Sequence, residues 1–176
     1  WGGQLQRWRN GVFNPNNPTS PTAFLPNDDE PALLPFVAKM SDDLLEFAEK
    51  PREVQILDEK GKLLLAGDNE RRFFEAAWVH KYNGKYYFSY STGDTHFICY
   101  AIGETPYGPF TYKGRILNPV VGWTSHHSIC EFKGKWYLFY HDSSLSKGVT
   151  HLRSVKIAEI KYNEDGTIQT LDPYKN

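Results

Sequence analysis

The sequence is poor in the residues that mark several common classes of protein. Its 176 residues include two cysteines, and the formal net charge is −1. Cys99 and Cys130 each lie in an apolar run, which predicts buried free thiols and argues against a disulfide scaffold or a metal pair. Positive and negative side chains alternate along the chain, without a basic face. We therefore expect an uncharged partner, and neither nucleic acid nor a membrane.

Long hydrophobic runs are also missing. No stretch approaches the roughly 20 apolar residues of a membrane-spanning helix. The chain opens at Trp1 without an initiator Met and without the charged and apolar segments of a signal peptide. We expect the natural chain to begin before Trp1, and the sequence does not separate a cytoplasmic from a secreted location.

Aromatic residues are abundant by contrast, with 11 Tyr, 11 Phe and 5 Trp in short alternating runs typical of β-sheets. Such rings can bind sugars, but in strands they more often fill cores or form cross-strand pairs. The length is sufficient for one domain with a core of its own. Composition thus favours a single β-rich domain and identifies no ligand.

An internal repeat predicts the architecture. Residues 83–90 (Asn-Gly-Lys-Tyr-Tyr-Phe-Ser-Tyr) recur at 133–140 (Lys-Gly-Lys-Trp-Tyr-Leu-Phe-Tyr), a displacement of 50 residues. In each copy an apolar strand precedes the Gly-Lys turn and an aromatic strand follows it, which is the pattern of a β-hairpin. Two more strands after each hairpin would make four antiparallel strands, as in a propeller blade. The strands expected around the two turns are 77–81, 97–102 and 109–113 in the first copy, and 128–132, 152–162 and 167–171 in the second.

The first 70 residues are less regular. Residues 14–21 are rich in Pro and Asn and predict an irregular surface segment, and strands are expected at 4–9, 36–40 and 53–57. The run that starts at Ser41 resembles a helix N-terminus, with a loop as the alternative. At this spacing we expect one partial propeller domain with three approximate blades, 1–70, 71–118 and 119–176. Closed propellers have about four to eight blades, so the chain should need missing N-terminal blades, a second chain or another copy.

Glu75 is the first candidate for chemistry. In a propeller the first strand of each blade lines the central axis, so a polar residue at its start points into the axial pocket. Glu75 begins such a strand, and the repeat displacement carries it onto Ser125. A partly desolvated carboxylic acid has a raised pKa, which suits a general acid near neutral pH. The alternative is a solvated Glu75 paired with Arg71 or Arg72.

Two adjacent histidines and one arginine are further candidates. His126 and His127 point to opposite faces of a strand, so at most one of them faces the axis. A single imidazole with carbonyl oxygens and waters could help to hold a hard cation, whereas a hydrogen-bonded structural histidine is the alternative. Arg153 could donate several hydrogen bonds to sugar hydroxyls or form a surface ion pair.

Several motifs, taken in order, resemble those of a known family. Residues 74–78 read Phe-Glu-Ala-Ala-Trp, residues 83–93 contain the first hairpin, and residues 106–110 and 126–129 read Pro-Tyr-Gly-Pro-Phe and His-His-Ser-Ile. Residues 153–155 and 162–168 match the closing blade. Together they resemble glycoside hydrolase family 43, of the β-xylosidase/α-L-arabinofuranosidase type, over about residues 1–171.

The resemblance implies a five-bladed β-propeller and inverting hydrolysis that releases xylose or arabinose from xylan-type hemicellulose or its oligosaccharides. By this resemblance Glu75 is the general acid and His126 is the histidine beside a bound calcium. Arg153 contacts the sugar, and Trp123 and His127 are weaker candidates for the substrate pocket.

One departure from the family pattern limits the expected activity. The family's general base Asp and its second, pKa-tuning Asp lie before residue 1 and have no matching position here. We therefore expect this chain alone to be inactive unless other blades complete the propeller. The competing hypothesis is a non-catalytic propeller fragment for carbohydrate binding or assembly. The sequence does not separate a xylosidase from an arabinofuranosidase.

Overall fold

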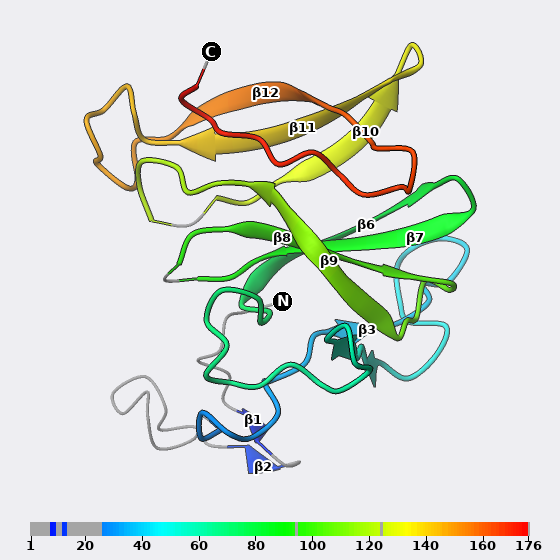
Figure 1. Ribbon diagram of the computed structural model, residues 1–176. Coiled ribbons are helices and arrows are strands. Elements are labelled where there is room, and N and C mark those ends of the chain that lie inside the picture. The colour runs from blue at the N-terminus through cyan, green and yellow to red at the C-terminus, as the bar shows by residue number, and fades with distance from the viewer. Residues whose placement is uncertain (1–7, 10–11, 14–25, 94, 124, 176) are drawn as a thin grey trace.

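The protein is built from strands, turns and irregular segments, as Figure 1 shows. The computed structural model describes residues 8–9, 12–13, 26–93, 95–123 and 125–175. Within these ranges there is no helix, so none that could cross a bilayer. The prediction of an all-β fold is confirmed for the described part of the chain.

The larger sheet has five strands in the order β5-β9-β8-β7-β6. Four of them form the antiparallel meander expected for the first repeat, and the short β5 adds to its outer edge in parallel with β9. The strands are β5 (Ile56–Leu57), β6 (Glu75–Tyr82), β7 (Lys85–Ser91), β8 (Ile98–Gly103) and β9 (Phe110–Leu117).

The second repeat forms a three-stranded antiparallel sheet of β10 (Ser128–Phe132), β11 (Lys135–Asp142) and β12 (Ser154–Ile160). The fourth strand predicted at 167–171 is wrong. This segment makes only isolated bridges, and the Leu171 N–H donates to the carbonyl of Ile116 in β9. Ile168 bridges to Tyr162 just after β12, so the backbone of this segment joins the second sheet to the first.

The two repeated hairpins have the same turn. Asn83 and Gly84 have φ of 46° and 79°, and Lys133 and Gly134 have φ of 52° and 76°. Positive φ at both central residues is the type I′ geometry, whose twist matches that of the flanking strands. The hairpins predicted from the repeat are therefore confirmed.

The N-terminal region contains only short strands. β3 (Phe36–Val37) pairs with β4 (Arg52–Glu53), and β1 (Trp8–Arg9) pairs with β2 (Val12–Phe13). The strand predicted at 36–40 is thus shorter than expected, and the one predicted at 53–57 is divided between β4 and β5. Residues 4–7 of the strand predicted at 4–9 lie outside the described residues. The surface segment predicted at 14–21 lies outside the described residues.

The helix start suggested at Ser41 is wrong, and the loop alternative is correct. The Ser41 hydroxyl donates to the carboxylate of Asp43, which in turn accepts from the backbone N–H of Leu45. Short polar side chains that bond to the nearby backbone offer it a turn in place of a helix. The local side-chain chemistry therefore decided between the two alternatives.

Two apolar clusters pack against the larger sheet. One joins it to the three-stranded sheet and includes Tyr100, Ile129 and Leu138, and the other joins it to the segment that carries Val54 and Phe73. Cys99 is fully buried in this second cluster. The prediction that Cys130 is buried is wrong, because alternation along β10 turns Ile129 inward and Cys130 outward.

The innermost strands of the two sheets, β6 and β10, lie side by side. The indole N–H of Trp78 on β6 donates to the carbonyl of Ile129 on β10 over 3.2 Å. Further along β6, His80 Nε2 lies 2.7 Å from the Tyr162 hydroxyl, and the His80 ring stacks on Tyr87 at 5.0 Å. Tyr82 stacks on Tyr162 at 3.6 Å, which closes an aromatic cluster at this end of the junction.

The buried His80 should make stability depend on pH. Burial lowers the pKa of His80 to about 4, whereas an unfolded histidine has a pKa of about 6.5. As pH falls through this window the unfolded chain takes up the proton and the folded chain resists it, so stability is lost. We expect the urea midpoint to fall between pH 7 and pH 4, and His80→Gln to reduce that fall. The exposed His151→Gln is the control and should keep the full fall. An equal fall in all three proteins would assign the proton uptake to other groups.

Candidate active site

Glu75 occupies the first position of β6, beside a β-bulge. It pairs with Ser91, whereas Trp78 pairs with Ser89, so Ala76 and the residue after it oppose a single residue of β7. Ala76 has φ of 61°, a left-handed conformation that costs a residue with a Cβ about 1–2 kcal/mol. Bulges re-aim neighbouring side chains, and backbone strain of this kind clusters at functional sites.

The carboxyl group of Glu75 faces the second sheet. Its Oε1 lies 3.3 Å from Nε2 of His126, and the Glu75 side chain is 22% exposed against 54% for His126. Arg71, one of the alternative partners considered for Glu75, binds Asp68 and Glu59. The structure therefore brings together a half-enclosed carboxyl from β6 and a more exposed imidazole from the segment just before β10.

His141, at the end of β11, belongs to the same group of side chains. The backbone N–H of His126 donates to His141 Nε2 over 3.1 Å, and the two rings stack at 6.3 Å. Burial lowers the pKa of His141, and the positive charge of Arg153 lowers it further. Sequence reasoning missed His141. The repeat offered a signal, because the displacement of 50 residues places His141 on Ser91, the partner of Glu75.

Arg153 lies immediately before β12 and is exposed. Its Nε donates to the carbonyl of Thr150 over 2.9 Å, which fixes the base of the guanidinium. Because Ser154 lies opposite Asp142 and Val155 opposite His141, Arg153 lies close to the end of β11 that carries His141. Four sequence segments thus contribute Glu75, His126, His141 and Arg153 to one region at the ends of their strands.

His127 faces away from this region. Its Nε2 lies 2.6 Å from the Ser89 hydroxyl of the neighbouring sheet, and its Nδ1 is enclosed without a partner among the described residues. Burial lowers the pKa of His127 to about 3, and the nearby His126 and His80 rings act in the same direction. His127 is therefore a neutral link between the sheets, while His126 faces Glu75.

Trp123 lies in the loop between β9 and β10, with 46% of its surface exposed. The ring of His96, from the loop between β7 and β8, meets it edge-on at 5.2 Å, and His96 Nδ1 bonds to the Trp123 carbonyl. His96 was also missed by sequence reasoning, since nothing local to it indicates a partner 27 residues away. The contact ties the loops of the two sheets together.

The described residues do not form a complete metal site. They contain no group of three or more His, Cys, Asp and Glu side chains that could hold an ion. Calcium takes roughly 6–8 oxygen ligands, whereas this region offers the imidazole of His126 beside the carboxyl of Glu75. The described residues therefore supply only a minor part of the ligands that a calcium ion takes.

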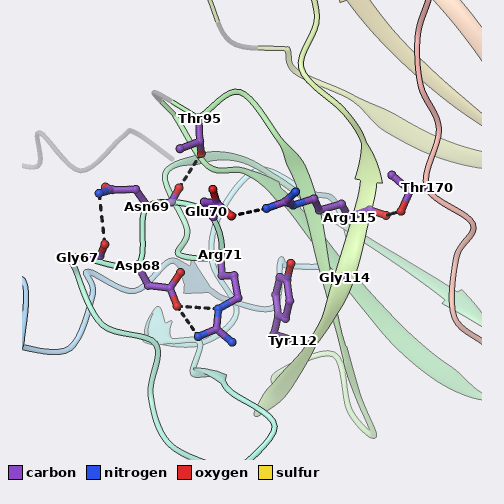
Figure 2. Close-up of a pocket in the computed structure, with 10 residues that line it drawn as sticks. All are labelled: Gly67, Asp68, Asn69, Glu70, Arg71, Thr95, Tyr112, Gly114, Arg115 and Thr170. Atoms are coloured by element: carbon purple, nitrogen blue, oxygen red, sulfur yellow. Dashed lines mark hydrogen bonds and ion pairs between the residues drawn. The ribbon is translucent and has the colours of Figure 1, made fainter. Parts of the chain in front are cut away.

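An open cleft of about 630 Å³ lies elsewhere, against β9 (Figure 2). Two ion pairs cross it, Arg71 with Asp68 and Arg115 with Glu70, and Tyr112 forms one wall. Strands β8 and β7 separate β9 from the strand that carries Glu75. This cleft is therefore distinct from the candidate active site.

The fold and the site define an all-β protein of adjoining antiparallel sheets, with a carboxyl group at the start of an innermost strand. The chain belongs to glycosyl hydrolases family 43, whose sequence pattern matches residues 36–168. The family predicted from the sequence motifs is thereby confirmed.

Three similar proteins illustrate the relationship. The chain is 63% identical to a xylosidase/arabinosidase of Bacteroides ovatus over 98% of this chain and 51% of that protein. It is 59% identical to xylosidase/arabinosidase 43A of Humicola insolens over 98% of this chain and 53% of that protein. A solved family 43 β-xylosidase/α-arabinofuranosidase from a compost microbial metagenome, in complex with xylotriose and calcium-free, matches with a TM-score of 0.92 and 59% identity, over 99% of this chain and 53% of that one. The chain thus spans about half the length of the relatives it matches.

The strained bulge beside Glu75 leads to a test of the site's backbone. We expect Ala76→Gly to stabilise the protein by up to about 1 kcal/mol, because relief of the left-handed conformation exceeds the entropic cost of a glycine. Ala77→Gly, next to it on β6, is the matched control and should destabilise by about 0.5–1 kcal/mol. Denaturant unfolding of the three proteins measures both changes. Equal destabilisation by the two glycines would show that Ala76 is not held in the left-handed region.

Proposed function

We propose that this chain is the C-terminal part of an inverting glycoside hydrolase that releases xylose, arabinose or both from xylan-type hemicellulose or its oligosaccharides. The names of the relatives and the xylotriose complex of the similar structure support this substrate class. The observation that carries the proposal is the contact of Glu75 with His126, which holds a half-enclosed carboxyl at the junction of two sheets.

The architecture proposed for the whole enzyme is a five-bladed β-propeller. The two sheets described here would be successive blades, since their innermost strands β6 and β10 lie side by side. The approximate blade limits are 1–70, 71–118 and 119–176. The preceding blades, on the same natural chain or on a second chain, would complete the ring and supply the general base.

Glu75 is the general acid in this proposal. Its protonated carboxyl gives a proton to the oxygen that links the terminal sugar to the rest of the substrate, and the bond from that oxygen to the anomeric carbon breaks. A carboxylate on the opposite face of the sugar, outside this chain, takes a proton from the attacking water. The configuration at the anomeric carbon is inverted.

The sugar-binding side of the site is proposed to be Arg153 and Trp123, with His127 as a supporting residue. Arg153 brings a guanidinium that can bond sugar hydroxyls, and the exposed indole of Trp123 offers a flat apolar wall. His127 would act from behind, since its Nε2 is bonded to Ser89 and fixes the strand that presents His126.

The competing candidate is a non-catalytic fragment for carbohydrate binding or assembly. It is favoured by apolar side chains left exposed on β12, where Val155 is 75% and Ile157 is 61% exposed. The proposed enzyme explains the same surface as the face that another blade covers. Turnover by a completed propeller separates the two candidates, because a pure binding module has none.

The first experiment joins this chain to the blades it would need. In a hybrid enzyme, this chain replaces the matching half of the Bacteroides ovatus relative, and hydrolysis of p-nitrophenyl xyloside and arabinofuranoside is measured. We expect turnover by the hybrid and none by this chain alone, because the chain has no position for the general base. The remaining half of the relative, alone, is the control. Turnover by the isolated chain would contradict the division of catalytic groups proposed here.

Removing the acid should abolish most of the hybrid's activity. We expect Glu75→Gln to lower kcat on xylobiose by about 10²–10⁴-fold with little change in KM, because the amide keeps the shape and has no proton to give. Glu70→Gln is the matched control, since Glu70 pairs with Arg115 in the separate outer cleft. Equal activity of the two variants would remove Glu75 from the mechanism.

Calcium is proposed to bind beside His126, which would supply one ligand while waters and carbonyl oxygens supply the others. When bound, the ion would add a fixed positive charge to the site. We expect EDTA to lower the thermal midpoint of the hybrid and added calcium to restore it, with a smaller calcium response in His126→Gln. The exposed His151→Gln should respond as the unaltered hybrid does. A full calcium response in His126→Gln would place the ion away from His126.

A further inference from the structure

His141 is fixed at the end of β11 by a reciprocal contact with Ser125. The His141 backbone N–H donates to the Ser125 hydroxyl over 3.2 Å, and that hydroxyl donates to the His141 carbonyl over 2.8 Å. Ser125 is 1% exposed, so this pair is shielded from water. The backbone of His141 is therefore anchored independently of its side chain.

The side chain of His141 bonds to backbone. Its Nε2 accepts the N–H of His126 over 3.1 Å, and the two rings lie nearly parallel, with 21° between their planes. The β10–β11 ladder ends where Ser128 pairs with Phe139, two residues short of His126. The imidazole thus gives the His126 N–H a partner beyond the end of the ladder, where backbone groups otherwise depend on water.

This bond determines where the His126 ring stands. A fixed backbone at His126 limits the positions of its imidazole, and that imidazole contacts the Glu75 carboxyl at 3.3 Å. Three residues from β11, the segment before β10, and β6 thus form one connected series. A displacement of about 1 Å at a reacting group can lower a rate by about 10²-fold.

We propose that His141 is a positioning residue of the active site, which holds His126 and, through it, the carboxyl of Glu75. The inference rests on the proposed function of Glu75. His141 contacts neither the substrate nor the reacting oxygen in this scheme. Its contribution lies in the hydrogen bond that Nε2 accepts.

The kinetic test uses two replacements in the hybrid enzyme. His141→Leu has no acceptor and should lower kcat on xylobiose by about 10–100-fold with little change in KM. His141→Gln carries a carbonyl oxygen that can reach the position of Nε2, and should recover most of that loss. His151→Leu, at an exposed site, is the control. Thermal midpoints of all variants show whether a loss of kcat follows a loss of folding.

A spectroscopic test on this chain itself examines the hydrogen bond directly. The side-chain ¹⁵N shifts of His141 at pH 7 should show a proton on Nδ1 and none on Nε2, since Nε2 accepts from His126. A proton on Nε2 would overturn the inference. So would an equal kcat in the unaltered hybrid and the two His141 variants, or an equal loss of kcat in His141→Leu and His141→Gln. An unaltered hybrid without activity would instead overturn the proposed function, and the ¹⁵N shifts would still decide whether the contact exists.

Discussion

The junction between the innermost strands β6 and β10 is the constraint on which the structure depends. Two sheets that meet edge to edge must satisfy the polar groups enclosed between them, because an unpaired buried group costs about 1–3 kcal/mol. Trp78 donates to the Ile129 carbonyl across this junction, and Ser89 bonds to His127. These contacts set the relative position of the sheets and so decide that Glu75 and His126 meet.

The two ends of the junction differ in chemistry. Toward the end of β6, His80 and Tyr82 are packed with Tyr162 in an aromatic cluster whose rings leave little room for movement. At the start of β6, Glu75 and His126 are partly exposed and polar, beside a strained bulge. One end therefore supplies packing, and the other keeps a carboxyl close to solvent, where a substrate can reach it.

Sequence reasoning was accurate where the signal is local. The turns at Asn83-Gly84 and Lys133-Gly134 carry their own backbone preference, so the hairpins followed from the repeat, although β6 begins two residues before the strand predicted at 77–81. It failed where the answer depends on distant partners. The segment 167–171 makes one bridge to Tyr162, just after β12, and then pairs with β9 through Leu171, and the exposure of Cys130 depends on which face of β10 has a neighbour. His141 and His96 were missed because their partners are fixed by register and loop contact, 15 and 27 residues away.

The proposed mechanism depends on Glu75 giving a proton to the leaving oxygen. Its most direct test compares Glu75→Gln with the unaltered hybrid enzyme on substrates whose leaving groups differ in pKa. If Glu75 gives this proton, the variant loses most of its rate on xylobiose, whose sugar leaving group needs the proton, and much less on aryl xylosides with acidic phenols, which leave without it. An equal loss on every substrate would show that Glu75 acts through binding or structure alone.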